Sequence, residues 1–144
     1  MEEMISLLSK DVTYLGHEFR EGCIYIKIES SRTEVECPLC GTSSFKRHSA
    51  YERIFGDLPI QGMKVILVLN NRKMFCNNSQ CSRTTFAERF DFISDKSKKT
   101  KRLEEEIVRI SLNMSTVAAA QLLSKSTVTI GRSTVSRLQK KSIN

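Results

Sequence analysis

The chain has 144 residues, of which 40% are apolar, and a formal net charge of +7. This length allows one ordinary domain or two small ones, and no apolar run comes near the roughly 18 residues of a membrane-spanning helix. The N-terminus, MEEMISLLSK, is acidic and lacks the apolar stretch of a signal peptide. We therefore expect a cytoplasmic protein without a membrane partner.

The charge is distributed unevenly along the chain. Residues 1–36 carry four Lys or Arg and eight Asp or Glu, a net charge of −4. Residues 37–102 carry thirteen against five, a net charge of +8, and residues 103–144 carry six against three, a net charge of +3. Such a basic segment is typical of proteins that bind a polyanion, most often nucleic acid. The alternative is a solvated basic surface without a partner.

The first segment, residues 1–36, combines a short helix with extended chain. Residues 2–10 (EEMISLLSK) are typical of a helix, whereas CIYIKIES alternates Ile24, Ile26 and Ile28 with more polar residues, as a half-buried strand does. We expect this acidic segment to pack on the domain that follows it.

Two short-spaced cysteine pairs come next. Cys37 and Cys40 form C-P-L-C, and Cys76 and Cys81 form C-N-N-S-Q-C, with 35 residues between the pairs. Two such turns can direct four thiolates at one Zn²⁺ ion, about 2.3 Å from each sulfur. The alternatives are two disulfides, which suit a secreted chain, or a redox pair, which leaves the second pair unexplained. The pattern favours a structural zinc site.

Two further residues could extend or alter this ligand set. Cys23 lies in the alternating strand and is better explained as a packed apolar residue than as a fifth ligand. His48, eight residues after Cys40, is a less favoured replacement because four cysteines already complete the tetrahedron.

The chain around the cysteines predicts a zinc ribbon over residues 37–93. The run Val65–Leu69 is short and β-branched, so GMKVILVLNNRKMFC is predicted to be a strand that leads to the second pair, and TTFAERF a strand that follows it. Asp57, Pro59 and Gly62 predict a turn before the first of these strands. Because so small a core cannot hold a sheet unaided, zinc binding should be part of folding, and metal removal should unfold residues 37–92.

Residues 94–102 (SDKSKKTKR) form a polar, strongly basic segment without a hydrophobic period. We interpret it as a linker that faces phosphates, and a solvated hinge is the alternative. Its candidate contacts with DNA are Lys98, Lys99, Lys101 and Arg102.

The last segment, residues 103–144, has the pattern of three helices. Leu103, Ile107, Ile110 and Met114 recur at helical spacing, and Ser115 can cap a following helix, TVAAAQLLS, whose alanines allow another helix to approach closely. IGRSTVSRLQKK then predicts a third helix. The sequence thus predicts an α+β protein, a small zinc-ribbon β domain followed by a three-helix helix-turn-helix domain.

The third helix is the candidate recognition helix. Val135 and Leu138 should face the core, and its N-terminal polar residues should enter the major groove of duplex DNA, where Arg can bind guanine edges or phosphates. The candidate contacts are Arg132, Ser133, Thr134, Ser136, Arg137 and Lys140. The helix can start at Ser124 or at Gly131, and the β-branched run between them favours the later start. Three amphipathic helices can also form a plain bundle or a dimerisation element.

The whole pattern resembles a known family. C-P-L-C-G, H-S-A-Y-E-R from His48, D-L-P-I-Q-G from Asp57, N-R-K-M-F-C-N-N-S-Q-C from Asn71 and R-T-T-F-A-E-R from Arg83 resemble the N-terminal zinc-binding domain of the ISL-three family of bacterial insertion-sequence transposases. S-T-V-S-R from Ser133 resembles the helix-turn-helix segment that follows it. The resemblance implies that the four paired cysteines bind zinc, and that the chain recognises the terminal inverted repeats of an element.

One feature departs from the family. Its members continue into an RNase H-like DDE-type catalytic domain with three carboxylates that hold two metal ions, whereas Glu104, Glu105 and Glu106 here occupy successive helix positions that cannot converge on one site. We therefore expect no catalysis, and no small-molecule substrate, from this chain. The expected partners are duplex DNA, a second copy of the chain or a full-length transposase. The alternative functions are a protein-interaction or assembly module and a DNA-binding regulator.

Overall fold

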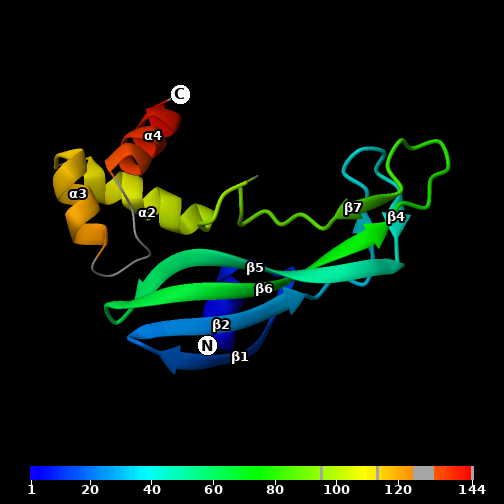
Figure 1. Cartoon of the computed structure of the whole chain (residues 1–144), viewed down its shortest axis with the longest axis horizontal. Coiled ribbons are helices and arrows are strands. Elements are labelled where there is room, and N and C mark those ends of the chain that lie inside the picture. The colour runs from blue at the N-terminus through cyan, green and yellow to red at the C-terminus, as the bar shows by residue number, and fades with distance from the viewer. Residues whose placement is uncertain (95, 113, 125–131, 144) are drawn as a thin grey trace. The chain divides into compact units, whose positions relative to one another are not determined.

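The computed structural model describes residues 1–94, 96–112, 114–124 and 132–143 (Figure 1). The fold is α+β: strands dominate the first two thirds of the described chain, and three helices follow them. In chain order the elements are α1 (Glu2–Leu8), β1 (Val12–Arg20), β2 (Cys23–Ser30), β3 (Val35–Glu36), β4 (Ser43–Ser44), β5 (Arg47–Ile60), β6 (Met63–Phe75), β7 (Thr85–Ala87), α2 (Lys101–Ser111), α3 (Thr116–Leu123) and α4 (Arg132–Ile143).

The strands form two sheets. The larger has the order β1-β2-β6-β5, and the short β7 also pairs with β6. β6 and β7 are antiparallel, with Met74 opposite Phe86, and β3 pairs with β4 in a separate two-stranded sheet. Each cysteine pair therefore lies between two paired strands.

Two tight turns connect the long strands. Glu21–Gly22 joins β1 to β2, and Gln61–Gly62 joins β5 to β6, and all four residues have φ between 50° and 77°. Positive φ at both central residues is the signature of the two-residue turn that matches the twist of a hairpin, and glycine adopts it without steric cost.

The predicted turn from Asp57 to Gly62 is shorter in the structure. β5 runs without interruption through Asp57 and Pro59 to Ile60, and only Gln61 and Gly62 turn. Pro59 is compatible with a strand here because β5 ends the strand order of this sheet, and edge strands tolerate a residue without an N–H. β1, which the sequence did not reveal, forms the opposite edge.

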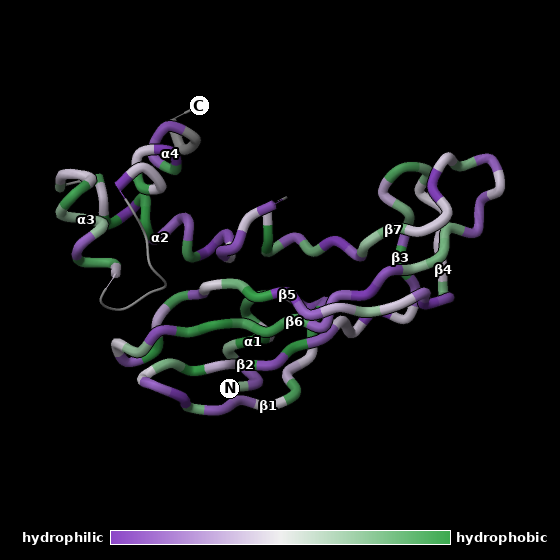
Figure 2. Tube along the Cα trace, in the orientation of Figure 1, coloured by the Kyte–Doolittle hydropathy of each residue, from purple (hydrophilic) through white to green (hydrophobic). Residues whose placement is uncertain are grey.

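The buried side of the larger sheet is aliphatic. Ile24, Ile26 and Ile28 of β2 alternate as predicted and are almost completely buried, as are Val65 and the two leucines that follow it in β6, Leu67 and Leu69. Figure 2 shows this apolar stretch of β6 as a continuous green run. Each of these side chains contributes about 1.5–3 kcal/mol through burial, so the sheet has a core of its own.

The chain forms two compact units. One consists of Met1–Gly16, Lys27–Arg53 and Val68–Asp91, and contains both cysteine pairs. The other consists of His17–Ile26, Ile54–Leu67 and Phe92–Asn144, and contains α2, α3 and α4. The contiguous domain boundaries proposed from the sequence remain predictions.

The three C-terminal helices share one hydrophobic cluster. It consists of Leu103, Ile107, Ala119, Leu123, Val135 and Leu138, with Leu58, Val108, Ile110 and Ala120 packed against it. Val135 and Leu138 thus face the core, as predicted. Thr100 caps α2 and Ser115 caps α3, each accepting a hydrogen bond from the backbone N–H three residues ahead.

The start and end of α2 differ from the prediction. The helix begins at Lys101 instead of Leu103 because Thr100 supplies the cap, and it ends at Ser111, so Met114 lies beyond it and is 37% exposed. The segment before the helix is also paired: the N–H of Gly56 in β5 donates to the carbonyl of Lys98 at 2.8 Å, and the N–H of Thr100 donates to the carbonyl of Gly56 at 3.0 Å. Residues 98–102 are therefore an ordered connection.

Candidate metal centre and nucleic-acid interface

The four cysteines sit on two backbone turns. Cys37 and Cys40 lie between β3 and β4, where the N–H of Cys37 donates to the carbonyl of Thr42 and the N–H of Gly41 donates back to the carbonyl of Cys37. Gly41 has φ +77°, a conformation that glycine adopts readily. Cys76 and Cys81 lie between β6 and β7, where the N–H of Cys76 donates to the carbonyl of Thr84 at 2.9 Å.

These turns bring four sulfur atoms together. All four Sγ atoms lie within 4.8 Å of one another, and those of Cys40 and Cys76 are 3.6 Å apart. A disulfide would require about 2.05 Å, and all five cysteines are free thiols. Four sulfurs about 2.3 Å from one Zn²⁺ ion are separated by about 3.8 Å from each other. The arrangement therefore fits a tetrahedral Zn²⁺ ion.

The surroundings of the sulfurs are suited to a structural ion. Val35, Cys37, Met74 and Phe86 form a small buried cluster, against which the other three ligands pack. Cys23 and His48 do not join the group of metal ligands found among the described residues. His48 is exposed, and its Nδ1 contacts the hydroxyl of Ser49 at 2.8 Å.

The thiols differ in acidity before metal binding. Hydrogen bonds from the side chain and backbone of Thr42 lower the pKa of Cys40 to about 6. At Cys76 the backbone N–H of Asn78 lowers the pKa, but desolvation and the three neighbouring thiols outweigh this effect and raise it to about 12. Bound Zn²⁺ would supply the positive charge that keeps all four sulfurs as thiolates.

Comparison with known proteins agrees with this geometry. Residues 33–81 match the family model described as the zinc-finger of transposase IS204/IS1001/IS1096/IS1165. This segment is therefore similar to the zinc finger of these transposases. The match contains all four cysteines and is confined to the ribbon, so it includes no catalytic domain. No curated protein and no solved structure matches the chain.

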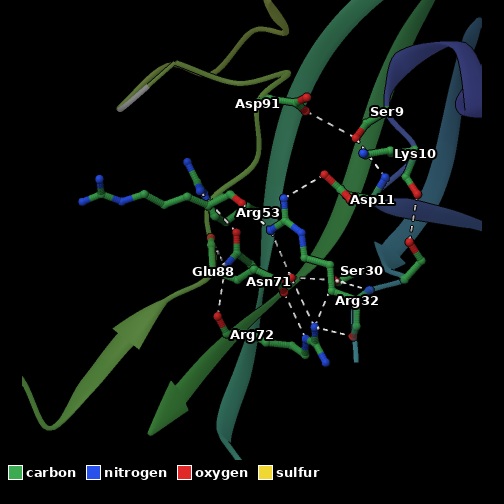
Figure 3. A network of polar contacts seen from close by, with 12 residues as sticks. Ser9, Lys10, Asp11, Ser30, Arg32, Arg53, Asn71, Arg72, Glu88 and Asp91 are labelled. Atoms are coloured by element: carbon green, nitrogen blue, oxygen red, sulfur yellow. Dashed lines mark hydrogen bonds and ion pairs between the residues drawn. The ribbon is translucent and has the colours of Figure 1, made fainter. Parts of the chain in front are cut away.

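A buried ionic network lies beside β6 and the residue that follows β7 (Figure 3). Glu88, which follows β7 and is 1% exposed, accepts hydrogen bonds from Nε of Arg72 at 3.0 Å and from the hydroxyl of Ser30 at 2.5 Å. Arg32 lies 3.4 Å from the same carboxylate and donates to Asp11 at 2.8 Å. The network connects the acidic first segment to both strands of the second cysteine turn.

Sequence reasoning missed this network because it depends on which residues of β6 and the chain after β7 lie opposite each other. The pairing of β6 with β7 places Arg72 next to Glu88, whose N–H donates to the carbonyl of Arg72 at 2.9 Å. Opposite charges at such cross-strand positions attract each other. Recognising the register of the two strands around the second cysteine pair would have identified the ion pair.

The predicted recognition residues all lie in α4, and five of the six line a common surface hollow. Arg132, Ser133, Arg137 and Lys140 are exposed, and Thr134 and Ser136 are half-buried. A surface hollow of about 590 Å³ is lined by Thr116 of α3 and by five α4 residues, Arg132, Ser133, Ser136, Arg137 and Lys140. No carboxylate lines this hollow in the described part of the chain. We call this surface the α4 basic face.

The basic residues before α2 have different environments. Lys98 and Lys101 are exposed, and Lys99 is half-buried. Burial and then the positive charge of Arg137 lower the pKa of Lys99, which indicates that Arg137 and Lys99 are electrostatic neighbours. Arg102 is different, because its guanidinium is bound to the carboxylate of Asp57.

The start of the last helix is described only in part. Ser124, one of the two predicted starts, is instead the C-cap of α3, with its N–H bound to the carbonyl of Ala120. The described part of α4 begins at Arg132, and Gly131 lies outside the described residues together with 125–130. Among the described residues, no helix has both the length and the apolar content needed to cross a membrane.

Proposed function

We propose that this chain is the DNA-binding portion of a bacterial insertion-sequence transposase and recognises the terminal inverted repeats of an element. In this proposal zinc is a structural ion, α2 to α4 form a helix-turn-helix, and α4 is the recognition helix. The transposase-type ribbon supports the family context. The observation that carries the DNA-binding assignment is the α4 basic face, where the described lining residues include three cations and no Asp or Glu.

The architecture of α4 suits insertion into a major groove. Val135 and Leu138 are buried in the helical cluster, so the helix is held by one side. Arg132, Ser133 and Arg137 lie on the exposed side, near the N-terminal end of the described helix, where recognition helices contact base edges. Arg can bind guanine O6 and N7 through two hydrogen bonds, whereas serine hydroxyls accept or donate to several bases.

The basic segment before α2 supplies sequence-independent contacts in this proposal. Lys98, Lys99 and Lys101 would attract phosphates whatever the base sequence, and the lowering of the pKa of Lys99 by the positive charge of Arg137, after burial, supports a basic surface shared with α4. Arg102 has a structural role instead, because its guanidinium is already bound to a buried carboxylate.

We further propose that this chain does not cut DNA. A DDE-type site requires three carboxylates that converge on two metal ions. Glu104, Glu105 and Glu106 are consecutive residues of α2, and Glu106 is bound to Arg109 at 2.9 Å. Within the described residues, the one group found with metal-binding geometry is the cysteine cluster.

One observation favours an assembly function as the second candidate. A surface hollow of about 690 Å³ beside α2 is lined by Val108, Leu112 and Leu138 together with Ser94 and four charged residues, and Leu112 is 67% exposed. Burial of this surface by a second copy would produce a dimer with no need for DNA. Sedimentation of the free protein would then reveal a dimer, and the α4 basic face would be incidental.

Selection of bound duplexes from a random pool, at near-physiological salt, tests the proposal. We expect the zinc-loaded protein to enrich one defined motif, and the Arg137→Ala variant to enrich a degenerate version of it. A parallel selection with the EDTA-treated protein measures how far recognition depends on the ribbon. Enrichment of no motif by the zinc-loaded protein would refute sequence-specific recognition.

A further inference from the structure

A second surface with aromatic and cationic residues lies on the zinc ribbon, outside the α4 basic face. Four consecutive residues follow β4 and are exposed, the last two of them in β5: Phe45, Lys46, Arg47 and His48. Phe45 is 69% exposed. No Asp or Glu interrupts this run, so it combines an accessible aromatic ring with two permanent positive charges.

The ring of Phe75 contacts two side chains of this run. The Lys46 ammonium lies 5.1 Å from the centroid of the Phe75 ring, and the His48 ring meets the same ring edge-on at 4.9 Å. Phe75 is itself half-buried. We call Phe45–His48 together with Phe75 the ribbon patch. Its Lys46 and His48 side chains are held against a fixed ring, which lowers the entropy that they lose on binding a ligand.

Two hydrogen bonds connect the ribbon patch and the strand before it to the second cysteine turn. The N–H of Phe75 donates to the carbonyl of Lys46 at 2.9 Å, and Cys76, a zinc ligand, is the next residue along the chain. The side-chain amide of Asn77 donates to the carbonyl of Ser43 at 3.2 Å, which connects the second cysteine turn to β4. Both sides of the patch are thus tied to the four-cysteine site.

We propose that the ribbon patch binds single-stranded DNA, with an unpaired base stacked on Phe45 and neighbouring phosphates bound by Lys46 and Arg47. Cations beside an accessible aromatic ring are the recurrent solution for single-stranded nucleic acid. Duplex DNA offers phosphates to the cations, but its base faces are covered by their neighbours, so Phe45 would gain little from it. This activity is additional to duplex recognition by α4.

Fluorescence anisotropy with labelled oligodeoxythymidine of about ten nucleotides tests this proposal. We expect Phe45→Ala to weaken binding by roughly ten-fold, because stacking of one base is lost. Phe45→Tyr, which keeps a ring, should bind within about two-fold of the wild type. An abasic oligonucleotide of equal length should bind Phe45→Ala and the wild type equally, since it offers phosphates without bases.

Leu39 supplies the matched control. It is 59% exposed and lies between the ligands of the first cysteine pair, and its sequence neighbours, Pro38 and Cys40, are not cations. Leu39→Ala should leave oligodeoxythymidine binding unchanged, and the zinc content of every variant should equal that of the wild type. Equal binding by Phe45→Ala and the wild type, or equal losses in Phe45→Ala and Leu39→Ala, would overturn the proposal.

The same assay separates this inference from the duplex proposal. Arg137→Ala should lose duplex affinity and retain oligodeoxythymidine binding, whereas Phe45→Ala should show the opposite pattern. If the wild-type protein binds oligodeoxythymidine but not duplex DNA, the proposed role of α4 is refuted and the proposal for the ribbon patch is retained. Failure of the wild-type protein to bind oligodeoxythymidine would refute the ribbon patch alone.

Discussion

Arg102, in the first turn of α2, binds the buried carboxylate of Asp57 in β5 through two nitrogens, with Nε donating to Oδ1 at 2.8 Å and Nη2 donating to Oδ2. The hydroxyl of Thr100, the N-cap of α2, donates to the same Oδ1 at 2.7 Å. Asp57 is 2% exposed. One carboxylate thus fixes both the cap and the first turn of α2 on β5.

Removal of this carboxylate should be costly. We expect Asp57→Ala to lower the free energy of unfolding by roughly 2–4 kcal/mol, because it leaves a partly buried guanidinium and the Thr100 hydroxyl without their acceptor. Urea denaturation measures the change. Glu106→Ala is the control, since its partner Arg109 is largely exposed and such a pair contributes less than about 1 kcal/mol. Equal losses would show that Asp57 has no special structural role.

The buried Glu88 gives a second stability prediction. We expect Glu88→Ala to destabilise the protein by about 3 kcal/mol, because Arg72 would retain its charge in a half-buried position without the bound carboxylate. Thermal unfolding with and without the substitution measures this loss. The exposed Glu36→Ala should change stability by less than about 0.5 kcal/mol. A loss as small for Glu88 would mean that water replaces the carboxylate.

Metal removal should affect the cysteine turns more than the sheet. The sequence predicted unfolding of residues 37–92, but β5 and β6 belong to a sheet with its own buried aliphatic core. We now expect EDTA, or the Cys76→Ser substitution, to abolish hydrogen-exchange protection at the Gly41 and Cys81 amides and to preserve it at Leu67. Loss of hydrogen-exchange protection throughout β6 would instead support the unfolding of residues 37–92 that the sequence predicted.

Zinc affinity should fall as the pH is lowered, because protons compete with the metal for the thiolates. Cys76, whose pKa of about 12 lies above neutrality, must release its proton on binding throughout the neutral range. Cys40 is mostly a thiolate at neutral pH and protonates as the pH falls through about 6. The apparent affinity, measured by chelator competition, should therefore fall more steeply below about pH 6. An equal dependence of zinc affinity on pH above and below about pH 6 would contradict the lowered pKa of Cys40.

Two groups of basic residues should affect DNA binding differently. Arg137→Ala or Arg132→Ala should reduce base preference by about 1–3 kcal/mol per lost contact. Combined neutralisation of Lys98, Lys99 and Lys101 should weaken all duplexes alike and reduce the salt slope by about 0.9 per phosphate contact. Lys10→Ala, in the acidic first segment, serves as the control. Uniform loss on all sequences from both groups would argue against α4 as the recognition helix.

Much of the local structure could be predicted because it depends on short-range rules. The cysteine spacing indicated the metal group, alternating isoleucines indicated β2, and Ser115 indicated the cap of α3. These signals act over a few residues. The α+β class followed from the same local periods.

The remaining features depend on partners distant in the sequence. Asp57 suggested a turn, but it lies inside β5 and its carboxylate is bound by Arg102, 45 residues away. The basic sequence around Arg102 likewise suggested a phosphate contact, and it gave no sign of the ion pair with Asp57. The ion pair of Glu88 with Arg72 required the register of two strands. The pattern of a single sequence does not show which distant residues will pair.

The position of the hairpin between the cysteine pairs has a consequence for the order of folding. The chain leaves Cys40, runs out along β5, turns at Gln61–Gly62 and returns along β6 to Cys76. Once this hairpin has formed, the ends of a long loop already lie together, so the entropy of loop closure no longer opposes assembly of the four ligands. Hairpins form in roughly microseconds. We therefore expect zinc binding to follow hairpin formation and to stabilise a chain reversal that the backbone has already made.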